Sequence, residues 1–396
     1  MLPPHWPPSV AAPHRSPCGF LRELLSPGRG PDPSIRGGTG GGTRSRGTWL
    51  GPRGGPRVPQ ALDIAPLEEA AEAAIADGLL ACQVAVARAG EIAWTRTFGR
   101  ASETTRFWVA SATKPIVASA IWLLMDEAKL DIARPVAHYI PEFAAHGKQD
   151  VTVEQVLLMT CGFPDAPMAA ADGADPARRV QQLADWRLEY PPGTRYVYHG
   201  MSAHWVLAEL IERLAAQPFC DFVEARVTRP LGLPRILGIP RAEQSQIAQL
   251  LPEAGDEVHE LFDYATKIEI GEPGGGAVMT AADLALFYQA LLHNPGKLWK
   301  PTTLADGTGN VRCRLPDPLM NLPANRTLGV VVGAGFGATW AASPTAFGWP
   351  GVGGQIGFAE PATGISFAFF QLGDLDTVSP FVRGVAMTNL ALELRP

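Results

Sequence analysis

The sequence of 396 residues has only five cysteines, six lysines and no long apolar run. The cysteines, at positions 18, 82, 161, 220 and 313, stand singly without a C-x-x-C pair, which suggests neither a zinc knuckle nor a disulfide framework. The scarcity of lysine and a formal net charge of −6 argue against nucleic-acid binding through phosphate neutralisation. The longest apolar run, residues 116–125, is half the length that spans a bilayer. We therefore expect no membrane segment, no nucleic-acid partner and a cytoplasmic location.

Proline and glycine are concentrated at one end of the chain. Residues 1–60 hold 12 of each, with eight arginines and two acidic residues. Such a segment cannot bury enough apolar surface to offset the entropy of ordering, so we expect a disordered tail. In a GC-rich gene, non-coding triplets upstream of the start codon also read as Pro, Gly and Arg. We therefore hypothesise that the start codon is misassigned and that the true initiator lies near Val58 or Leu62. Residues 61–396 are expected to form the folded domain.

The pattern of apolar residues predicts helices and strands at both ends of this domain and helices in the middle. Helices are predicted at 66–80, 116–130 and 281–293, and from Ser379-Pro380 onward; strands are predicted at 83–88, 92–97, 328–332, 354–359 and 365–372. Thr280, with Asp283 three residues on, is a predicted helix N-cap. The arrangement favours an α/β fold whose sheet is assembled from both ends of the chain, with residues 150–265 as a helical insertion.

Several catalytic motifs are missing. There is no G-x-S-x-G elbow, which excludes the α/β-hydrolase triad, and no H-E-x-x-H zinc motif. Residues 333–338 imitate a dinucleotide fingerprint, but no helix follows them before Pro344, so we interpret them as a loop at a strand end. We expect no metal and no cofactor.

A serine and a lysine lie three residues apart at the start of the apolar stretch. On a helix, Ser111 and Lys114 would share one face, so the amine could take the serine proton or stabilise the group that does. Backbone N–H groups at a helix N-terminus could also bind a developing oxyanion. In the alternative reading Ser111 is an ordinary N-cap, but a lysine in the first turn opposes the helix dipole.

The segments around this pair resemble the serine β-lactamase and penicillin-binding-protein family, in the branch of the class C β-lactamases and class VIII esterases. The similar segments are FWVASATKP at 107–115, MDEAKLD at 125–131, VEQVLLMTCG at 153–162, YPPG at 190–193 with Tyr198, GGG at 274–276 with TAADL at 280–284, and GVGG at 351–354. The resemblance covers about residues 62–394. It implies a central antiparallel sheet flanked by helices, an inserted all-helical subdomain, and a catalytic cleft between them.

The resemblance also implies roles for individual residues. Ser111 matches the nucleophile, Lys114 its partner and Tyr198 the general base. The backbone N–H groups of Ser111 and Val352 would form the oxyanion hole, with Gly351 in the same strand segment.

Two positions depart from the family pattern. The asparagine of Tyr-x-Asn is replaced, since Tyr198 is followed by His199 and Gly200, and the cationic or titratable position of the strand is Trp349. His199 could replace lost basicity or point away from the site, and Trp349 could pack in the core or line an acyl pocket. With Lys114 as the single cation, we expect the phenol of Tyr198 to ionise only above neutral pH.

We expect a serine hydrolase that forms an acyl-enzyme on Ser111, most simply a carboxylesterase on small esters. The alternatives are a β-lactamase or a D-Ala carboxypeptidase-type amide hydrolase and, in another class, a catalytically weakened binding or scaffold protein. The expected partner is a small ester or amide substrate. The sequence gives no oligomeric state.

Overall fold

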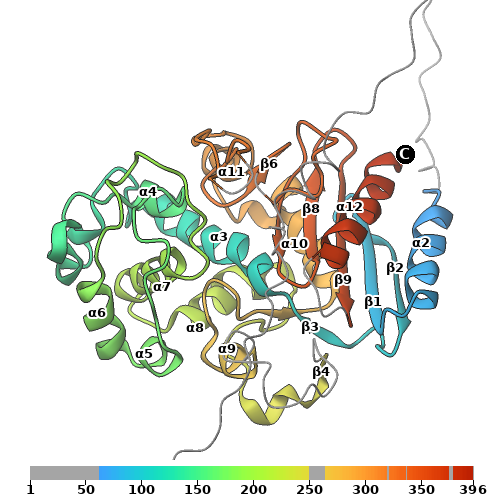
Figure 1. The fold of residues 1–396 in the computed structure, drawn as a ribbon, viewed down its shortest axis with the longest axis horizontal. Coiled ribbons are helices and arrows are strands. Elements are labelled where there is room, and N and C mark those ends of the chain that lie inside the picture. Colours follow the sequence, from blue (N-terminus) through green and yellow to red (C-terminus); the bar gives the residue numbers. More distant parts are fainter. Residues whose placement is uncertain (1–61, 249–263, 319–320, 336, 374–377, 396) are drawn as a thin grey trace, which may run out of the picture. The chain divides into compact units, whose positions relative to one another are not determined.

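A six-stranded antiparallel sheet forms the centre of the computed structural model, which describes residues 62–248, 264–318, 321–335, 337–373 and 378–395. Its strands lie in the order β2-β1-β9-β8-β7-β6. Their bounds are β1 Ala81–Arg88, β2 Glu91–Gly99, β6 Val331–Val332, β7 Phe347–Gly351, β8 Gln355–Glu360 and β9 Ile365–Leu372. The sheet therefore joins strands from both ends of the chain, as the sequence predicts (Figure 1).

Helices cover both faces of this sheet. Helices α2 (Ala65–Ala76) and α12 (Val378–Glu393) pack on one face, and α10 (Ala281–His293) packs on the other. Along β1, Val84 and Val86 belong to the core on the α2 and α12 side, whereas Ala85 and Ala87 belong to the core on the α10 side. Successive side chains of a strand point to opposite faces, so burial on both faces explains why the inner strands β1 and β9 are largely apolar, whereas the edge strand β2 carries exposed polar residues.

A second group of helices lies beyond α3 (Lys114–Asp126), on the side away from α2 (Figure 1). It contains α4 Val153–Leu157, α5 Ala170–Ala174, α6 Pro176–Asp185, α7 Ser202–Ala215 and α8 Phe219–Val223. Helix α3 packs against α7, α8 and α11 (Pro301–Thr308), and its side chains from Lys114 to Leu124 are all buried. A small sheet, β4-β3-β5, joins Ile247–Ala248, Arg106–Trp108 and Val278–Met279, and α9 (Tyr264–Ile270) precedes β5.

Most of the predicted elements are confirmed, with two corrections. Thr280 and Asp283 form a reciprocal capping box at the start of α10, and residues 89 and 90 join β1 to β2 with positive φ. The predicted strand at 328–332 shrinks to Val331–Val332, because Thr327 and Val330 hydrogen-bond to each other and form a turn. The helix predicted at 116–130 is α3, which begins at Lys114 and ends at Asp126; Ser111 lies before it, in a short 3₁₀ turn, η1 (Ala110–Thr113).

The chain divides by its contacts at residue 61, and all described residues lie in the second unit. The predicted tail, residues 1–60, lies outside the described residues. Of the predicted insertion, residues 150–248 and 264–265 are described, and they contain α4 to α8.

Candidate active site

Ser111 lies in the η1 turn, and Lys114 is the first residue of α3, which follows it directly. Residues three apart eclipse each other in a 3₁₀ turn, and Lys114 Nζ donates a hydrogen bond to Ser111 Oγ over 3.0 Å. Ala110, directly before the serine, has a φ of +47°, a left-handed conformation that is uncommon outside glycine. The turn is held by Thr113 Oγ1, which donates to the Ala110 carbonyl and accepts from the N–H of Ala277.

The glycine triplet at 274–276 holds the lysine from the other side. Lys114 Nζ donates a second hydrogen bond, of 2.6 Å, to the carbonyl of Gly274. A Cβ on Gly276 would lie 2.4 Å from the backbone nitrogen of Glu272, so the loop closes this tightly only because that residue is glycine. Lys114 is only 1% exposed, and its position is fixed by these two acceptors.

Tyr198, in the loop between α6 and α7, completes a hydrogen-bonded group of three. Its hydroxyl lies 2.8 Å from Ser111 Oγ, and Lys114 Nζ lies 5.2 Å from the centre of its ring. Burial opposes ionisation of the phenol, but the charge of Lys114, hydrogen bonds with Ser111 and Lys114, and the charge of Arg326 together lower the pKa of Tyr198 below its ordinary value of 10. As a phenolate, Tyr198 lies within hydrogen-bond distance of the serine hydroxyl and can accept its proton. The lowered pKa favours this phenolate form.

The end of β7 forms the other wall of the site. Gly351 packs against η1 so closely that a Cβ there would lie 2.3 Å from the carbonyl oxygen of Val109. Trp349 is 2% exposed and stacks on Tyr198, with ring centres 5.8 Å apart. Val352 is 47% exposed and lines the same pocket as Ser111.

That pocket has a volume of about 260 Å³ and opens over the serine. Its lining residues are Ser111, Tyr198, Gly337, Thr339, Trp349, Pro350, Gly351, Val352, Gly353, Gly354, Ile356, Pro380 and Phe381. None of them carries a charge at neutral pH apart from an ionised Tyr198. A small, largely apolar cavity of this kind suits an uncharged substrate.

The structure does not bring His199 to this pocket. Its ring is fully buried, and it accepts a hydrogen bond at Nε2 from the Phe163 N–H and donates one from Nδ1 to the carbonyl of Val197. Burial lowers the pKa of His199 to about 4, so the ring is neutral at pH 7. His199 is therefore neither a replacement base nor a substrate-contacting residue: its ring points away from the site and into the core, against Cys161. Gly200 does not line the pocket either, and a Cβ there would meet no atom within 4 Å.

Sequence reasoning missed one functional group, the guanidinium of Arg326. Arg326 is 1% exposed, and its Cζ lies 4.3 Å from the centre of the Trp349 ring. It lies in a loop between α11 and β6, in no recognisable motif, so only the fold reveals it. The expectation that Lys114 is the single cation acting on Tyr198 is wrong, because the charge of Arg326 also lowers the pKa of this phenol.

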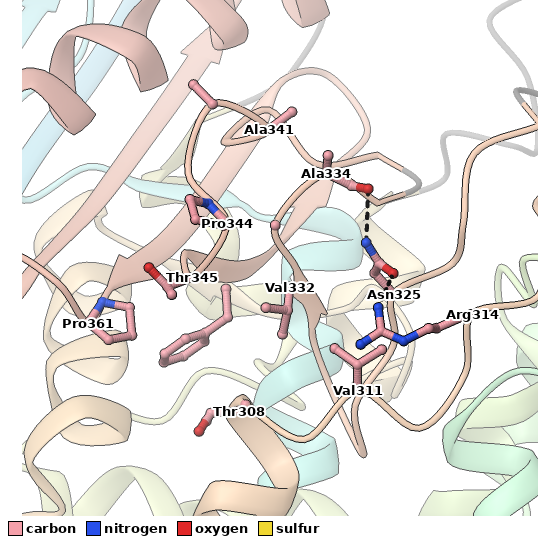
Figure 2. Close-up of a pocket in the computed structure, with 14 residues that line it drawn as sticks. Thr308, Val311, Arg314, Asn325, Val332, Ala334, Ala341, Pro344, Thr345 and Pro361 are labelled. Atoms are coloured by element: carbon pink, nitrogen blue, oxygen red, sulfur yellow. Dashed lines mark hydrogen bonds between the residues drawn. The ribbon is translucent and has the colours of Figure 1, made fainter.

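Another cavity, of about 630 Å³, lies at the β6 edge and contains none of these residues. Figure 2 shows its lining, which includes Arg314, Asn325 and Phe347. The loop that imitates a dinucleotide fingerprint borders it at Gly333 and Ala334, and no helix follows it in the described part, residues 337–373. Within the described ranges, no three His, Cys, Asp or Glu side chains group as metal ligands, and no helix is long and apolar enough to cross a membrane.

Comparison with known proteins agrees with this geometry. The family model described as Beta-lactamase matches residues 67–380. Esterase EstB of Burkholderia gladioli is 30% identical over 338 residues, which cover 71% of this chain and 83% of EstB. Esterase/beta-lactamase LipL of Mycobacterium tuberculosis is 27% identical over 319 residues, covering 71% of each chain.

Solved structures show the same fold. A penicillin-binding-protein homologue from Caulobacter crescentus superposes with a TM-score of 0.72 at 26% identity, over 83% of this chain and 96% of that one. A family VIII carboxylesterase superposes with a TM-score of 0.69 at 24% identity over the same shares.

The chain belongs to the Beta-lactamase family. It is a serine hydrolase of the β-lactamase and transpeptidase type, and esterases are among its relatives.

Proposed function

We propose that this protein is a carboxylesterase that hydrolyses small, uncharged esters through an acyl-enzyme on Ser111. The observation that carries the proposal is the hydrogen-bonded group of Ser111, Lys114 and Tyr198 at the mouth of an apolar pocket. The similarity to EstB, an esterase, supports the same substrate class.

In the proposed reaction Tyr198, as the phenolate, takes the proton of Ser111 while Oγ attacks the ester carbonyl carbon. The backbone N–H groups of Ser111 and Val352 would receive the negative charge that develops on the carbonyl oxygen. Tyr198 then returns the proton to the leaving alcohol as the C–O bond breaks. Tyr198 then takes a proton from a water molecule, whose oxygen attacks the acyl carbon. As the bond between this carbon and Ser111 Oγ breaks, Tyr198 returns the proton to Oγ, so that the acid leaves and both the serine and the phenolate are restored.

Two features favour esters over β-lactams. Gly200 replaces the asparagine whose amide would orient an amide carbonyl, and the loss of one such hydrogen bond weakens transition-state binding by roughly 1–3 kcal/mol. The described lining of the pocket also has no arginine or lysine to pair with the carboxylate of a penicillin or cephalosporin. An ester without a charged group needs neither contact.

Hydrolysis of β-lactams is the second candidate, because the relative LipL is named as both esterase and β-lactamase. A comparison of kcat/KM for p-nitrophenyl butyrate and nitrocefin separates the two. We expect the ester to be the better substrate, and a higher value for nitrocefin would refute the ester preference.

A fluorophosphonate probe tests the nucleophile. It should label the folded protein on Ser111 and leave folded Ser111→Ala protein unlabelled. A folded wild-type protein that resists the probe would contradict the proposed function.

A further inference from the structure

A buried arginine without a matching carboxylate lies next to the candidate active site. Arg326 is 1% exposed, and no ion pair joins it to a carboxylate among the described residues. It donates a hydrogen bond of 3.1 Å to the carbonyl of Leu157, and a second hydrogen bond joins it to the side chain of Tyr196. Removing a guanidinium from water is costly unless other groups stabilise its charge, so its presence here needs an explanation.

The explanation lies in the aromatic rings between Arg326 and the serine. The guanidinium carbon is 4.3 Å from the centre of the Trp349 ring, which is within the range of a cation–π contact. The same indole stacks on Tyr198 with an angle of 29° between the ring planes. Trp349 Nε1 is buried with no acceptor among the described residues, so these ring contacts hold the indole.

Among the described residues, the charges that act on the phenol of Tyr198 are those of Lys114 and Arg326, both positive. Two buried carboxyl groups lie one neighbour farther out, Glu272 near Lys114 and Asp317 near Tyr196. Burial lowers the pKa of His199 to about 4 and holds that of His204 well below its ordinary value, so both are neutral at pH 7. Burial raises the pKa of Tyr196 and of Cys313, so these two are neutral as well. Tyr198 therefore has two positive charges near it and no negative one from these four groups.

We propose that Arg326 is a positioning residue that supplies, from behind Trp349, the second positive charge that makes Tyr198 an effective base. In the related family a cationic side chain occupies the strand position that is Trp349 here. In this arrangement Arg326 supplies the positive charge of that side chain, and Trp349 occupies its position and contacts both Arg326 and Tyr198. The inference rests on the proposed function of Ser111 and Tyr198 and adds a residue that touches neither substrate nor serine.

The loop that carries Arg326 is anchored so that its side chain faces inward. Figure 2 shows the preceding residue, Asn325, on the lining of the neighbouring cavity, where its side chain donates a hydrogen bond of 3.0 Å to the carbonyl of Ala334. The backbone of Asn325 has a φ of +45° and accepts a hydrogen bond from the N–H of Val332. With Asn325 held in this cavity, Arg326 is directed into the core.

The test is the pH dependence of kcat/KM for p-nitrophenyl butyrate, whose ascending limb reports the ionisation of the free enzyme's base. Arg326→Met and Arg326→Gln should move this limb upward by about 0.5–1 pH unit, which lowers the rate roughly 3- to 10-fold on the acid side. Arg326→Lys keeps a positive charge and should keep the limb within about 0.3 unit of wild type. Arg100→Met removes an exposed arginine directly after β2, at the edge of the sheet opposite β6, and should leave the limb in place.

An unmoved limb in a folded neutral variant would overturn the inference, and so would an Arg326→Lys limb displaced as far as the neutral ones. Either result, with Ser111-dependent turnover intact, leaves the proposed function standing, whereas turnover that survives Ser111→Ala refutes the function itself.

If neither neutral variant folds, ultraviolet absorbance of Lys114→Met protein gives the answer, compared with the same protein carrying Tyr198→Phe. With Arg326 as the remaining cation, a Tyr198-dependent phenolate signal should appear at lower pH than the signal of Tyr288, a buried tyrosine whose pKa burial raises and on which no cation acts. No such signal before alkaline unfolding would overturn the inference.

Discussion

At the residue scale, the chemistry depends on three polar side chains that converge from distant parts of the sequence. Ser111 Oγ lies 3.0 Å from Lys114 Nζ and 2.8 Å from the hydroxyl of Tyr198. A lysine at the start of a helix is electrostatically unfavourable, and the carbonyl of Gly274 provides a compensating acceptor. Helix stability does not explain this placement, and the catalytic role that we propose for Lys114 does.

Removing the phenol hydroxyl or the amine should abolish most of the activity while the protein stays folded. We expect Tyr198→Phe and Lys114→Met each to lower kcat by roughly 10²–10⁴, the usual contribution of a general base. Because both act on the same proton, the double variant should lose little more than either single one. Steady-state kinetics with a circular dichroism control measures this, and additive losses would mean that the two residues act independently.

The open space at Gly200 allows the lost amide to be restored. A side chain at this position meets no atom within 4 Å of its Cβ, so Gly200→Asn should fold normally. We expect it to raise kcat/KM for amide-containing substrates while leaving the ascending pH limb unchanged, since an amide carries no charge. A shift of the limb would show that the substitution disturbs Tyr198.

Much of this site could be predicted from the sequence, but not its electrostatics. The Ser-x-x-Lys spacing and the family motifs identify Ser111, Lys114 and Tyr198, whose side chains the structure brings together. Arg326 lies in no motif. Its guanidinium comes close to Trp349, and so to Tyr198, only when the loop before β6 packs on β7. Likewise, only the fold shows that His199 turns toward Cys161 and away from its neighbour Tyr198.

At the scale of elements, the site depends on how closely β7 approaches the η1 turn. A Cβ on Gly351 would lie 2.3 Å from the carbonyl oxygen of Val109, a backbone atom that cannot move without shifting the turn. Gly351→Ala should therefore displace Val352 from Ser111 and lower kcat about 10²-fold, the cost of losing an oxyanion donor.

Gly200→Ala is the matched control, because it adds the same methyl group where space is free. It should keep activity within about two-fold of wild type. Equal activity of the two alanine variants would contradict the role given to the β7 contact.

The sequence predicts the buried strands better than it predicts the turns that precede α3 and β6. Continuous apolar runs predict β1, β8 and β9 well, because burial on both faces leaves a clear pattern. The serine turn was expected to be part of the helix, since apolar periodicity does not distinguish a 3₁₀ turn from the first turn of α3. The strand before residue 333 was predicted too long, because the Thr327–Val330 turn depends on side-chain hydrogen bonds.

At the scale of the whole molecule, two buried histidines make stability depend on pH. Burial lowers the pKa of His199 from 6.5 to about 4 and lowers that of His204 as well. Between these values the unfolded chain binds protons that the folded protein does not, so the free energy of unfolding falls as pH decreases from 7 to 4. For His199 alone the loss is on the order of 3 kcal/mol.

Urea denaturation at pH 7.5 and pH 5 measures this dependence. His199→Gln can keep hydrogen bonds to Phe163 and Val197 without titrating, so its unfolding free energy should change less between the two pH values. An equal change in wild type and variant would mean that His199 does not contribute.

The most direct test of the proposed reaction is the mass of the protein trapped during turnover. Protein quenched with acid while it hydrolyses p-nitrophenyl butyrate should carry one butyryl group on the peptide that contains Ser111, and Ser111→Ala protein should carry none. Continued hydrolysis by folded Ser111→Ala protein, or a butyryl group on another residue of an active wild-type enzyme, would contradict the assignment of Ser111 as the nucleophile.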